Sequence, residues 1–150
     1  RLGRFEKAIS LGKDLLKIKS EKKLLSEISK IIGESHFNLA QYSDALPFLE
    51  QYEGKNGKWK NIDFYQLGFV YYKIGKYEQA IKQFNKILSK PTELAQSSYY
   101  YLGDSYLKVN KKTAALNAFR IAGSMNFDST IEEDASLQYV KLSYEIGNPY

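Results

Sequence analysis

The 150-residue sequence contains no cysteine, one histidine, one methionine and only three prolines. The absence of cysteine excludes a disulfide framework, a thiolate metal site and a thiol nucleophile. The longest uninterrupted apolar runs span only a few residues, so no transmembrane helix is predicted. The hydrophobic content of 43%, arranged with clear periodicity, excludes an intrinsically disordered chain.

Motifs that carry catalysis or bind cofactors are also missing. Metal-ligand spacing, a glycine-rich phosphate loop and a nucleophile motif do not occur in the sequence. His36 has no constellation of partner residues, and we expect it to pack as a structural side chain. The acids Glu132, Glu133 and Asp134 open an expected helix, where negative charge is favourable. We therefore predict a protein with no catalytic residues, no cofactor and no metal.

The net charge of +5 is confined to one end of the chain. Residues 1–30 hold nine basic and four acidic side chains, whereas the other 120 residues hold thirteen of each. A basic end attracts nucleic acid or an acidic surface. The alternative interpretation is a solvated helix face whose acidic complement lies in repeats further upstream. Because charge is balanced beyond residue 30, we do not expect nucleic-acid binding.

Small residues recur about every 35 positions. One series comprises Gly33, Gly68 and Gly103. A second comprises Ala8, Ala45, Ala80 and Ala115, and a third comprises Gly3, Ala40, Gly75, Asn110 and Gly147. A fixed period of this length predicts a stacked-repeat protein.

Within each period the apolar residues predict two helices. Leu67, Tyr71 and Ile74 follow three- and four-residue spacing, which places them on one stripe of a helix. Gly68 lies inside this pattern, where glycine costs about 1 kcal/mol relative to alanine. We expect the compensation to be close approach of the paired helix, with the small side chain of Ala80 opposite Gly68 and that of Ala115 opposite Gly103. Helices are expected near 4–19, 21–39, 43–53, 59–74, 77–90, 93–109, 112–124 and 131–146.

The segments between the expected helices contain residues that are typical of helix ends and turns. Gly75 and Asn110 fall where a helix must stop, and both residue types tolerate the left-handed conformation of a helix C-terminus. Ala40 occupies the same position in the first copy, which weakens the argument there. The run Thr130-Ile131-Glu132-Glu133 has the pattern of a capping box that would start the last helix. The segment 53–58 contains Asn-Gly, a turn marker, and is expected to be a surface linker.

Two copies of the period resemble a known family. One reads Phe64-x2-Leu67-Gly68-x2-Tyr71, then Ala80-x3-Phe84 and Pro91, and the next reads Tyr99-x2-Leu102-Gly103-x2-Tyr106, then Ala115-x3-Phe119. Both resemble the tetratricopeptide repeat, with aromatic residues in place of its tryptophan. The copy from Ser29 to Leu49 matches the pattern less closely, and in the last copy Val140 replaces the small residue. The resemblance implies an all-α, right-handed superhelical solenoid of helical hairpins.

We expect one array over residues 1–150. It consists of a partial repeat at 1–20, repeats at about 21–58, 59–92 and 93–129, and a partial repeat at 130–150. The sequence opens as if in the middle of a hairpin, and we expect it to be part of a longer protein.

The resemblance implies a concave groove lined by the first helix of each hairpin and an outer face formed by the second. It assigns packing positions to Phe64, Tyr71, Tyr99, Tyr106, Tyr42 and Tyr77. The candidate groove residues are Asn38, Tyr65, Phe69, Tyr72, Lys73, Tyr100, Tyr101, Lys108, Lys141 and Tyr144. Tyrosine offers a large contact area at low rotamer cost, and lysine holds acidic side chains or a terminal carboxylate. The alternative is that the rings pack against neighbouring helices and the lysines are merely solvated.

We therefore predict a module that binds a protein or peptide partner in a tyrosine-rich groove. The rival interpretation is a structural spacer or scaffold with contacts through the outer face or the array ends, including self-association. The chaperone-tail clamp of some tetratricopeptide domains is not formed, since Tyr65, Phe69 and Tyr101 occupy its positions. Residues 63–68 and 101–108 also resemble long exported repeat proteins of Bacteroidetes-type bacteria, which implies the periplasm or outer membrane.

Overall fold

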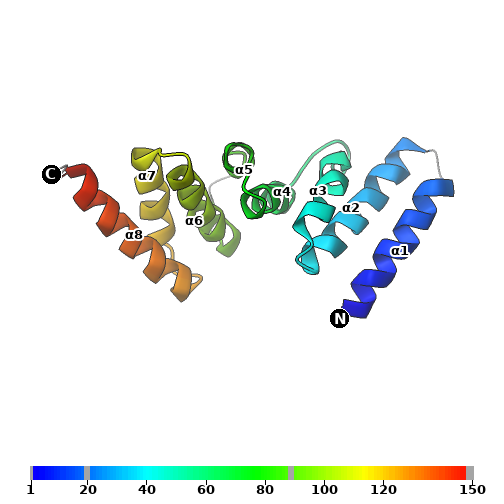
Figure 1. The fold of residues 1–150 in the computed structure, drawn as a ribbon, viewed down its shortest axis with the longest axis horizontal. Coiled ribbons are helices and arrows are strands. Elements are labelled where there is room, and N and C mark those ends of the chain that lie inside the picture. Colours follow the sequence, from blue (N-terminus) through cyan, green and yellow to red (C-terminus); the bar gives the residue numbers. More distant parts are fainter. Residues whose placement is uncertain (1, 19–20, 88–89, 148–150) are drawn as a thin grey trace.

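The computed structural model describes residues 2–18, 21–87 and 90–147, and within these ranges it is all-α (Figure 1). The helices are α1 (Leu2–Ile18), α2 (Lys22–Asn38), α3 (Tyr42–Gln51), α4 (Asn61–Lys73), α5 (Tyr77–Phe84), α6 (Glu93–Lys108), α7 (Lys112–Gly123) and α8 (Ser129–Gly147). The eight expected helices are confirmed, with boundaries that mostly differ by one to three residues. The largest difference is α5, which ends six residues early because Ile87 donates to the carbonyl of Phe84, three residues back, at 3.2 Å. Of the remaining positions of that expected helix, 85–87 and 90 are not helical, and 88 and 89 lie outside the described residues.

The helices form a row of antiparallel hairpins with α1 and α8 at opposite ends (Figure 1). We call α2, α4, α6 and α8 the first helices and α1, α3, α5 and α7 the second helices. Successive first helices contact one another, whereas the described parts of the second helices do not. The array is therefore narrower along the first helices, which places them on its inner side. The helix axes also change direction from one hairpin to the next, since α4 and α5 are seen end-on in Figure 1 and their neighbours from the side. The right-handedness of this rotation stays a prediction.

The interior glycines mark the closest approach within each hairpin. A Cβ atom added to Gly68 would lie 2.9 Å from a ring carbon of Phe84, and one added to Gly103 would lie 2.9 Å from Phe119. One added to Gly33 would lie 2.7 Å from Leu49. Close approach is thus confirmed, although the nearest atoms do not belong to Ala80 or Ala115. The large side chain four residues after each alanine reaches over the glycine instead.

The three turns between paired helices have the same conformation. Ala40, Gly75 and Asn110 have φ angles of 57°, 83° and 61°, all in the left-handed region. In each turn the next amide donates across the helix end, as when Gln41 donates to the carbonyl of His36 at 2.9 Å. This 6→1 bond is the Schellman arrangement, in which the left-handed residue ends the helix. The left-handed turn is therefore confirmed at Gly75 and Asn110, and alanine adopts it at position 40 as well.

A buried glutamine fixes the connection between α7 and α8. Gln96 is fully buried, and its Nε2 atom donates to the carbonyl of Ala122 at 3.1 Å and to that of Met125 at 2.7 Å. Its Oε1 atom accepts from the amide of Asp128 at 2.8 Å. Asp128 in turn caps α8, since its Oδ1 atom accepts from the amide of Ile131 at 3.1 Å. The expected capping box at Thr130 is therefore wrong, because α8 begins earlier, at Ser129.

The longer connection between α3 and α4 contains the expected turn. Asn56 and Gly57 both have positive φ, and Lys55 pairs with Lys58 across them. The flanks are joined because Trp59 Nε1 donates to the carbonyl of Tyr52 at 2.9 Å, with the two rings stacked. The linker is thus anchored to the array at its base.

The turn at Ala40 predicts a stabilising substitution. Ala40→Gly should raise the free energy of unfolding by about 0.5–1 kcal/mol, because glycine has no Cβ atom to disfavour the left-handed region. Gly75→Ala is the matched control and should lower it by about 1 kcal/mol, since open space surrounds Gly75 and only the backbone is affected. Urea unfolding measures both changes. Equal signs for the two variants would contradict this account.

The buried amide predicts a destabilising substitution. Gln96→Leu should lower the free energy of unfolding by about 3 kcal/mol, because it removes the buried hydrogen bonds that Gln96 makes with the carbonyls of Ala122 and Met125 and with the amide of Asp128. Gln79→Leu, at an exposed position of α5, should change it by less than about 0.5 kcal/mol. Equilibrium unfolding in urea distinguishes the two, and similar losses would show that the buried bonds contribute little.

Candidate functional site

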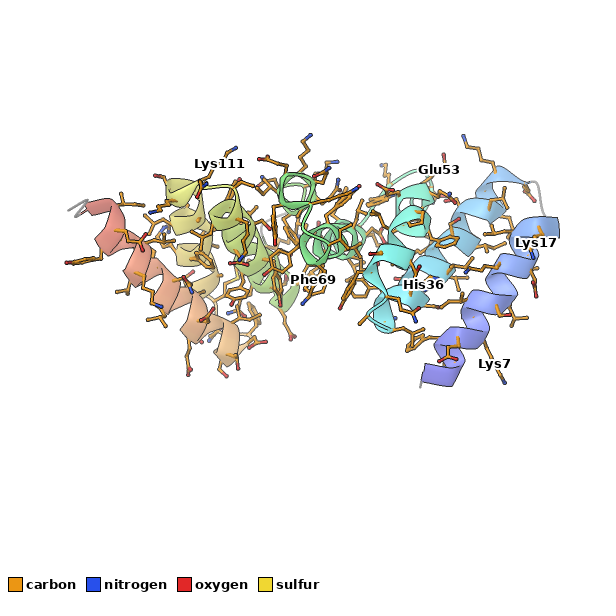
Figure 2. The ribbon with its side chains drawn as sticks, in the orientation of Figure 1. Lys7, Lys17, His36, Glu53, Phe69 and Lys111 are labelled. Carbon is orange, nitrogen blue, oxygen red and sulfur yellow. The ribbon has the colours of Figure 1, made fainter. Side chains whose placement is uncertain are left out.

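Aromatic rings form one connected group in the middle of the array. Phe69 of α4, labelled in Figure 2, is at its centre. Its ring centroid lies 5.0–6.2 Å from the centroids of five other rings. We define the aromatic cluster as Phe37, Tyr42, Tyr65, Phe69, Tyr72, Tyr77, Tyr100 and Tyr101, each of which is half-buried.

The cluster joins three successive hairpins. Phe37 of α2 lies 5.7 Å from Phe69 of α4, which lies 5.0 Å from Tyr101 of α6. The Phe69–Tyr101 pair is edge-on at 79°, an arrangement that aromatic rings favour and that contributes about 0.5–1.5 kcal/mol beyond burial. These contacts lie on the side where the first helices touch one another. The cluster therefore holds the hairpins together along the inner side of the array.

Two hydroxyl groups of the cluster are already occupied by the next hairpin. Tyr72 donates to Asp104 Oδ2 at 2.5 Å, and Tyr100 donates to Asp134 Oδ2. Burial raises the pKa of both phenols, and the hydrogen bonds to the carboxylates raise it further. Burial likewise raises the pKa of Tyr65 and of Tyr101. At neutral pH these four phenols are therefore protonated, and the protons of Tyr72 and Tyr100 are directed at carboxylates.

The structure brings together five of the ten residues proposed for the groove. They are Tyr65, Phe69, Tyr72, Tyr100 and Tyr101. Tyr42 and Tyr77 were assigned to packing alone, yet they contact Phe69 and Tyr72 and complete the same cluster. The aromatics assigned to packing and those proposed for the groove therefore contact one another in one half-buried layer. Phe37 was missed, although it precedes Tyr72 by the 35-residue period.

The other candidates lie around or beyond the cluster. Lys73 Nζ is 5.4 Å from the ring centroid of Phe69, within range of a cation–π interaction. Asn38 is exposed, and its side-chain amide donates to the carbonyl of Glu34 in its own helix at 2.9 Å. Lys108 and Lys141 are exposed, and Tyr144 is 69% exposed on α8. Lys73 and Lys108 also lie in the last turns of α4 and α6, where positive charge favours the helix dipole.

Polar bonds also join the first helices α2 and α4. Lys30 Nζ lies 2.9 Å from Asp63 Oδ1, and Gln66 donates to Glu34 Oε2 at 3.1 Å. Outside this face, Tyr71 donates to Glu50 on α3, and its pKa rises to about 12, chiefly through burial and then through this bond. Carboxylates are therefore interspersed with the exposed lysines, and the face carries both signs of charge.

His36 lies in a packing position. It is buried, stacks on Phe48 with a centroid separation of 5.9 Å, and its Nδ1 atom is 2.7 Å from Gln41 Oε1. The part of the chain that the structure describes contains no group of three or more His, Cys, Asp or Glu side chains suited to a metal. Among the described helices, none has the length and apolar content needed to cross a bilayer.

Residues 64–92 match the family model of the tetratricopeptide repeat. This segment is therefore similar to a tetratricopeptide repeat. It comprises most of α4 and all of α5, and it carries four members of the aromatic cluster: Tyr65, Phe69, Tyr72 and Tyr77. A comparison with curated proteins found no match. Tetratricopeptide repeats are in general modules for protein–protein interaction, and the described part of this chain is an all-α helical array consistent with such repeats.

The raised phenol pKa values predict alkaline destabilisation. Tyr71 has a folded-state pKa of about 12, above the value near 10 of an unfolded chain. Below pH 10 the phenol is protonated in both states, so its contribution to stability is constant. Above pH 10 the unfolded chain loses the proton first, so the free energy of unfolding falls as pH rises. Tyr71→Phe should make this fall shallower.

The tyrosinate absorbance of the native and the urea-unfolded chain checks this directly. The native chain should ionise fewer of its thirteen tyrosines at about pH 11 than the unfolded chain does. Coincident titration curves would show that the phenols of the cluster are open to solvent.

Proposed function

We propose that this chain is a non-catalytic module that binds an extended segment of a partner protein along its first helices, over the aromatic cluster. The observation that carries the proposal is the continuity of the cluster, which runs from α2 to α6 without a gap between ring neighbours. Half-buried rings on the inner side of an array offer a large apolar surface that needs little further ordering.

The polar groups around the rings indicate which types of side chain a partner would present. The hydroxyls of Tyr72 and Tyr100 already donate to Asp104 and Asp134, so they are not open donors for a peptide backbone. The ring faces and edges are then the contact surface, which favours aliphatic or aromatic side chains in the partner. Lys73 and Lys108, exposed at the ends of α4 and α6, suit acidic residues beside them.

A second candidate function is a structural spacer. The same ring contacts and the Tyr72–Asp104 bond join neighbouring hairpins, so they stiffen the array whether or not a partner binds. In that case the cluster acts only as an inter-repeat core, and partners contact the outer face or the array ends.

We also propose a location for the chain. Residues 63–68 and 101–108 resemble long exported repeat proteins of Bacteroidetes-type bacteria, which supports the periplasm or the outer membrane. Fractionation of cells that produce the complete gene product tests this, and recovery in the cytoplasmic fraction would contradict it.

Selection from a random peptide library displayed on phage tests the binding function. We expect enrichment of peptides that combine aromatic or aliphatic residues with acidic ones. Lys73→Glu with Lys108→Glu should weaken binding of the selected peptides by about tenfold or more, because repulsion replaces attraction. The matched control, Lys82→Glu with Arg120→Glu, makes the same charge change at exposed positions of second helices and should leave binding unchanged.

A second variant set removes the rings themselves. Tyr65→Ala, Tyr72→Ala and Tyr101→Ala together should abolish peptide binding, with circular dichroism confirming that the helices remain. Equal effects of the two charge variants, or no enrichment at all, would favour the spacer. Because the charge variants leave the cluster intact, they remain informative even if the alanine variant unfolds.

A further inference from the structure

The apolar surface of the inner side extends beyond the aromatic cluster. Ile62, in the first turn of α4, is 40% exposed. It lies three residues before Tyr65 and seven before Phe69, so the three side chains share one side of α4. Helix α4 contacts both α2 and α6, so the exposure of Ile62 belongs to a first helix with a neighbour on each side. A stripe of apolar surface therefore runs along α4 from Ile62 to Phe69.

Carboxylates occupy the corresponding positions of α2. Glu27 precedes Ile62 by the 35-residue period, and Glu27 is exposed. Glu34 precedes Phe69 by the same period. Glu34 lies on the inner side, because its Oε2 atom accepts from Gln66 of α4 at 3.1 Å. Glu27 is seven residues earlier and shares this side of α2. The inner face is therefore acidic where α2 borders the apolar stripe.

The neighbouring lysines leave this acidic region uncompensated. Lys30 stands between the two acids in the sequence, but its Nζ atom lies 2.9 Å from Oδ1 of Asp63, which is 5% exposed. Lys23 lines the same cleft as Glu27, yet both side chains are exposed, so water screens their attraction. Among the described residues, no ion pair involves Glu27 or Glu34. Both carboxylates are therefore open to a cation from a partner.

The opposite charge lies at the C-terminal ends of α4 and α6. Lys73 is exposed, and its Nζ atom is 5.4 Å from the ring centroid of Phe69. Lys108 occupies the same position on α6, whereas α2 has the uncharged Asn38 there. The acid of α6, Asp104, is already bonded to a hydroxyl of the aromatic cluster and precedes Lys108 by one turn. Charge on the inner face therefore changes sign between α2 and the ends of α4 and α6.

We propose that the partner segment carries opposite charges at its two ends. A basic side chain binds at Glu27 and Glu34, and acidic side chains bind at Lys73 and Lys108. The apolar residues between them lie on Ile62 and the rings. This inference rests on the proposed function, since it specifies the partner of the same surface. A uniformly acidic partner is disfavoured, because it would place like charges together at α2.

Charge exchange between the chain and a peptide tests the proposal. The probe is a synthetic peptide selected from the phage library on the wild-type chain, and fluorescence anisotropy measures its affinity. We expect it to contain a basic residue separated from acidic residues by apolar ones. Replacing that basic residue by glutamate should weaken binding by about tenfold or more. Glu27→Lys with Glu34→Lys should restore the affinity for the glutamate peptide and weaken binding of the original one.

Two further variant pairs serve as controls. Asp14→Lys with Asp44→Lys makes the same charge change at exposed positions of α1 and α3, and should restore nothing. Glu27→Gln with Glu34→Gln removes the two charges with little change of shape, and should bind the two peptides with nearly equal affinity. The glutamine pair decides the question if circular dichroism shows that the lysine pair on α2 unfolds.

The outcomes separate this inference from the proposed function. Selected peptides without a basic residue would overturn the inference and leave the binding function in place. A folded Glu27→Lys with Glu34→Lys variant that fails to restore binding, or restores it no better than the variant on α1 and α3, would do the same. A glutamine pair that discriminates between the peptides as the wild-type chain does would also overturn the inference. No enrichment of any peptide would overturn the proposed function and this inference together.

Discussion

The structure depends on a steric constraint repeated in every complete hairpin: one position of the first helix must lack a side chain so that a large side chain of the second can cross it. Gly33, Gly68 and Gly103 meet this requirement, with Leu49, Phe84 and Phe119 lying over them. A Cβ atom there would lie less than 3.0 Å from that side chain, so the side chain or its helix would have to shift. The close pairing leaves successive first helices in contact while the second helices spread, and this difference in spacing bends the array toward its first helices.

The inner side created in this way is filled by aromatic rings. Phe69 contacts rings from α2, α3, α4 and α6, so one side chain links three hairpins. The hydroxyls of Tyr72 and Tyr100 extend the linkage to acids of the following first helix. The surface that we propose for a partner is therefore also part of the packing between repeats. Stability and recognition share the same residues, which is why charge changes at exposed lysines separate them better than ring deletions.

Several features were predictable because they depend on neighbours close in sequence. Helix periodicity, the left-handed turns at Gly75 and Asn110 and the Asn-Gly turn at residue 56 need only local backbone preferences. The errors lie where side chains reach across the fold. Phe84, not Ala80, meets Gly68 because a long side chain extends a full turn beyond its own backbone position. Asp128 caps α8 because the buried Gln96 holds its amide in place, a contact between residues 32 positions apart.

The 35-residue period alone was sufficient to define the repeat, the hairpins and the order of helices, since each of these follows from local periodicity repeated along the chain. It also placed Tyr65, Tyr72, Tyr100 and Tyr101 on the first helices. The period could not show that Tyr42 and Tyr77 join Phe69 and Tyr72 in one layer, nor that carboxylates of the next hairpin occupy two of the hydroxyls. Those contacts depend on the distance and rotation between hairpins, and packing in three dimensions sets both quantities.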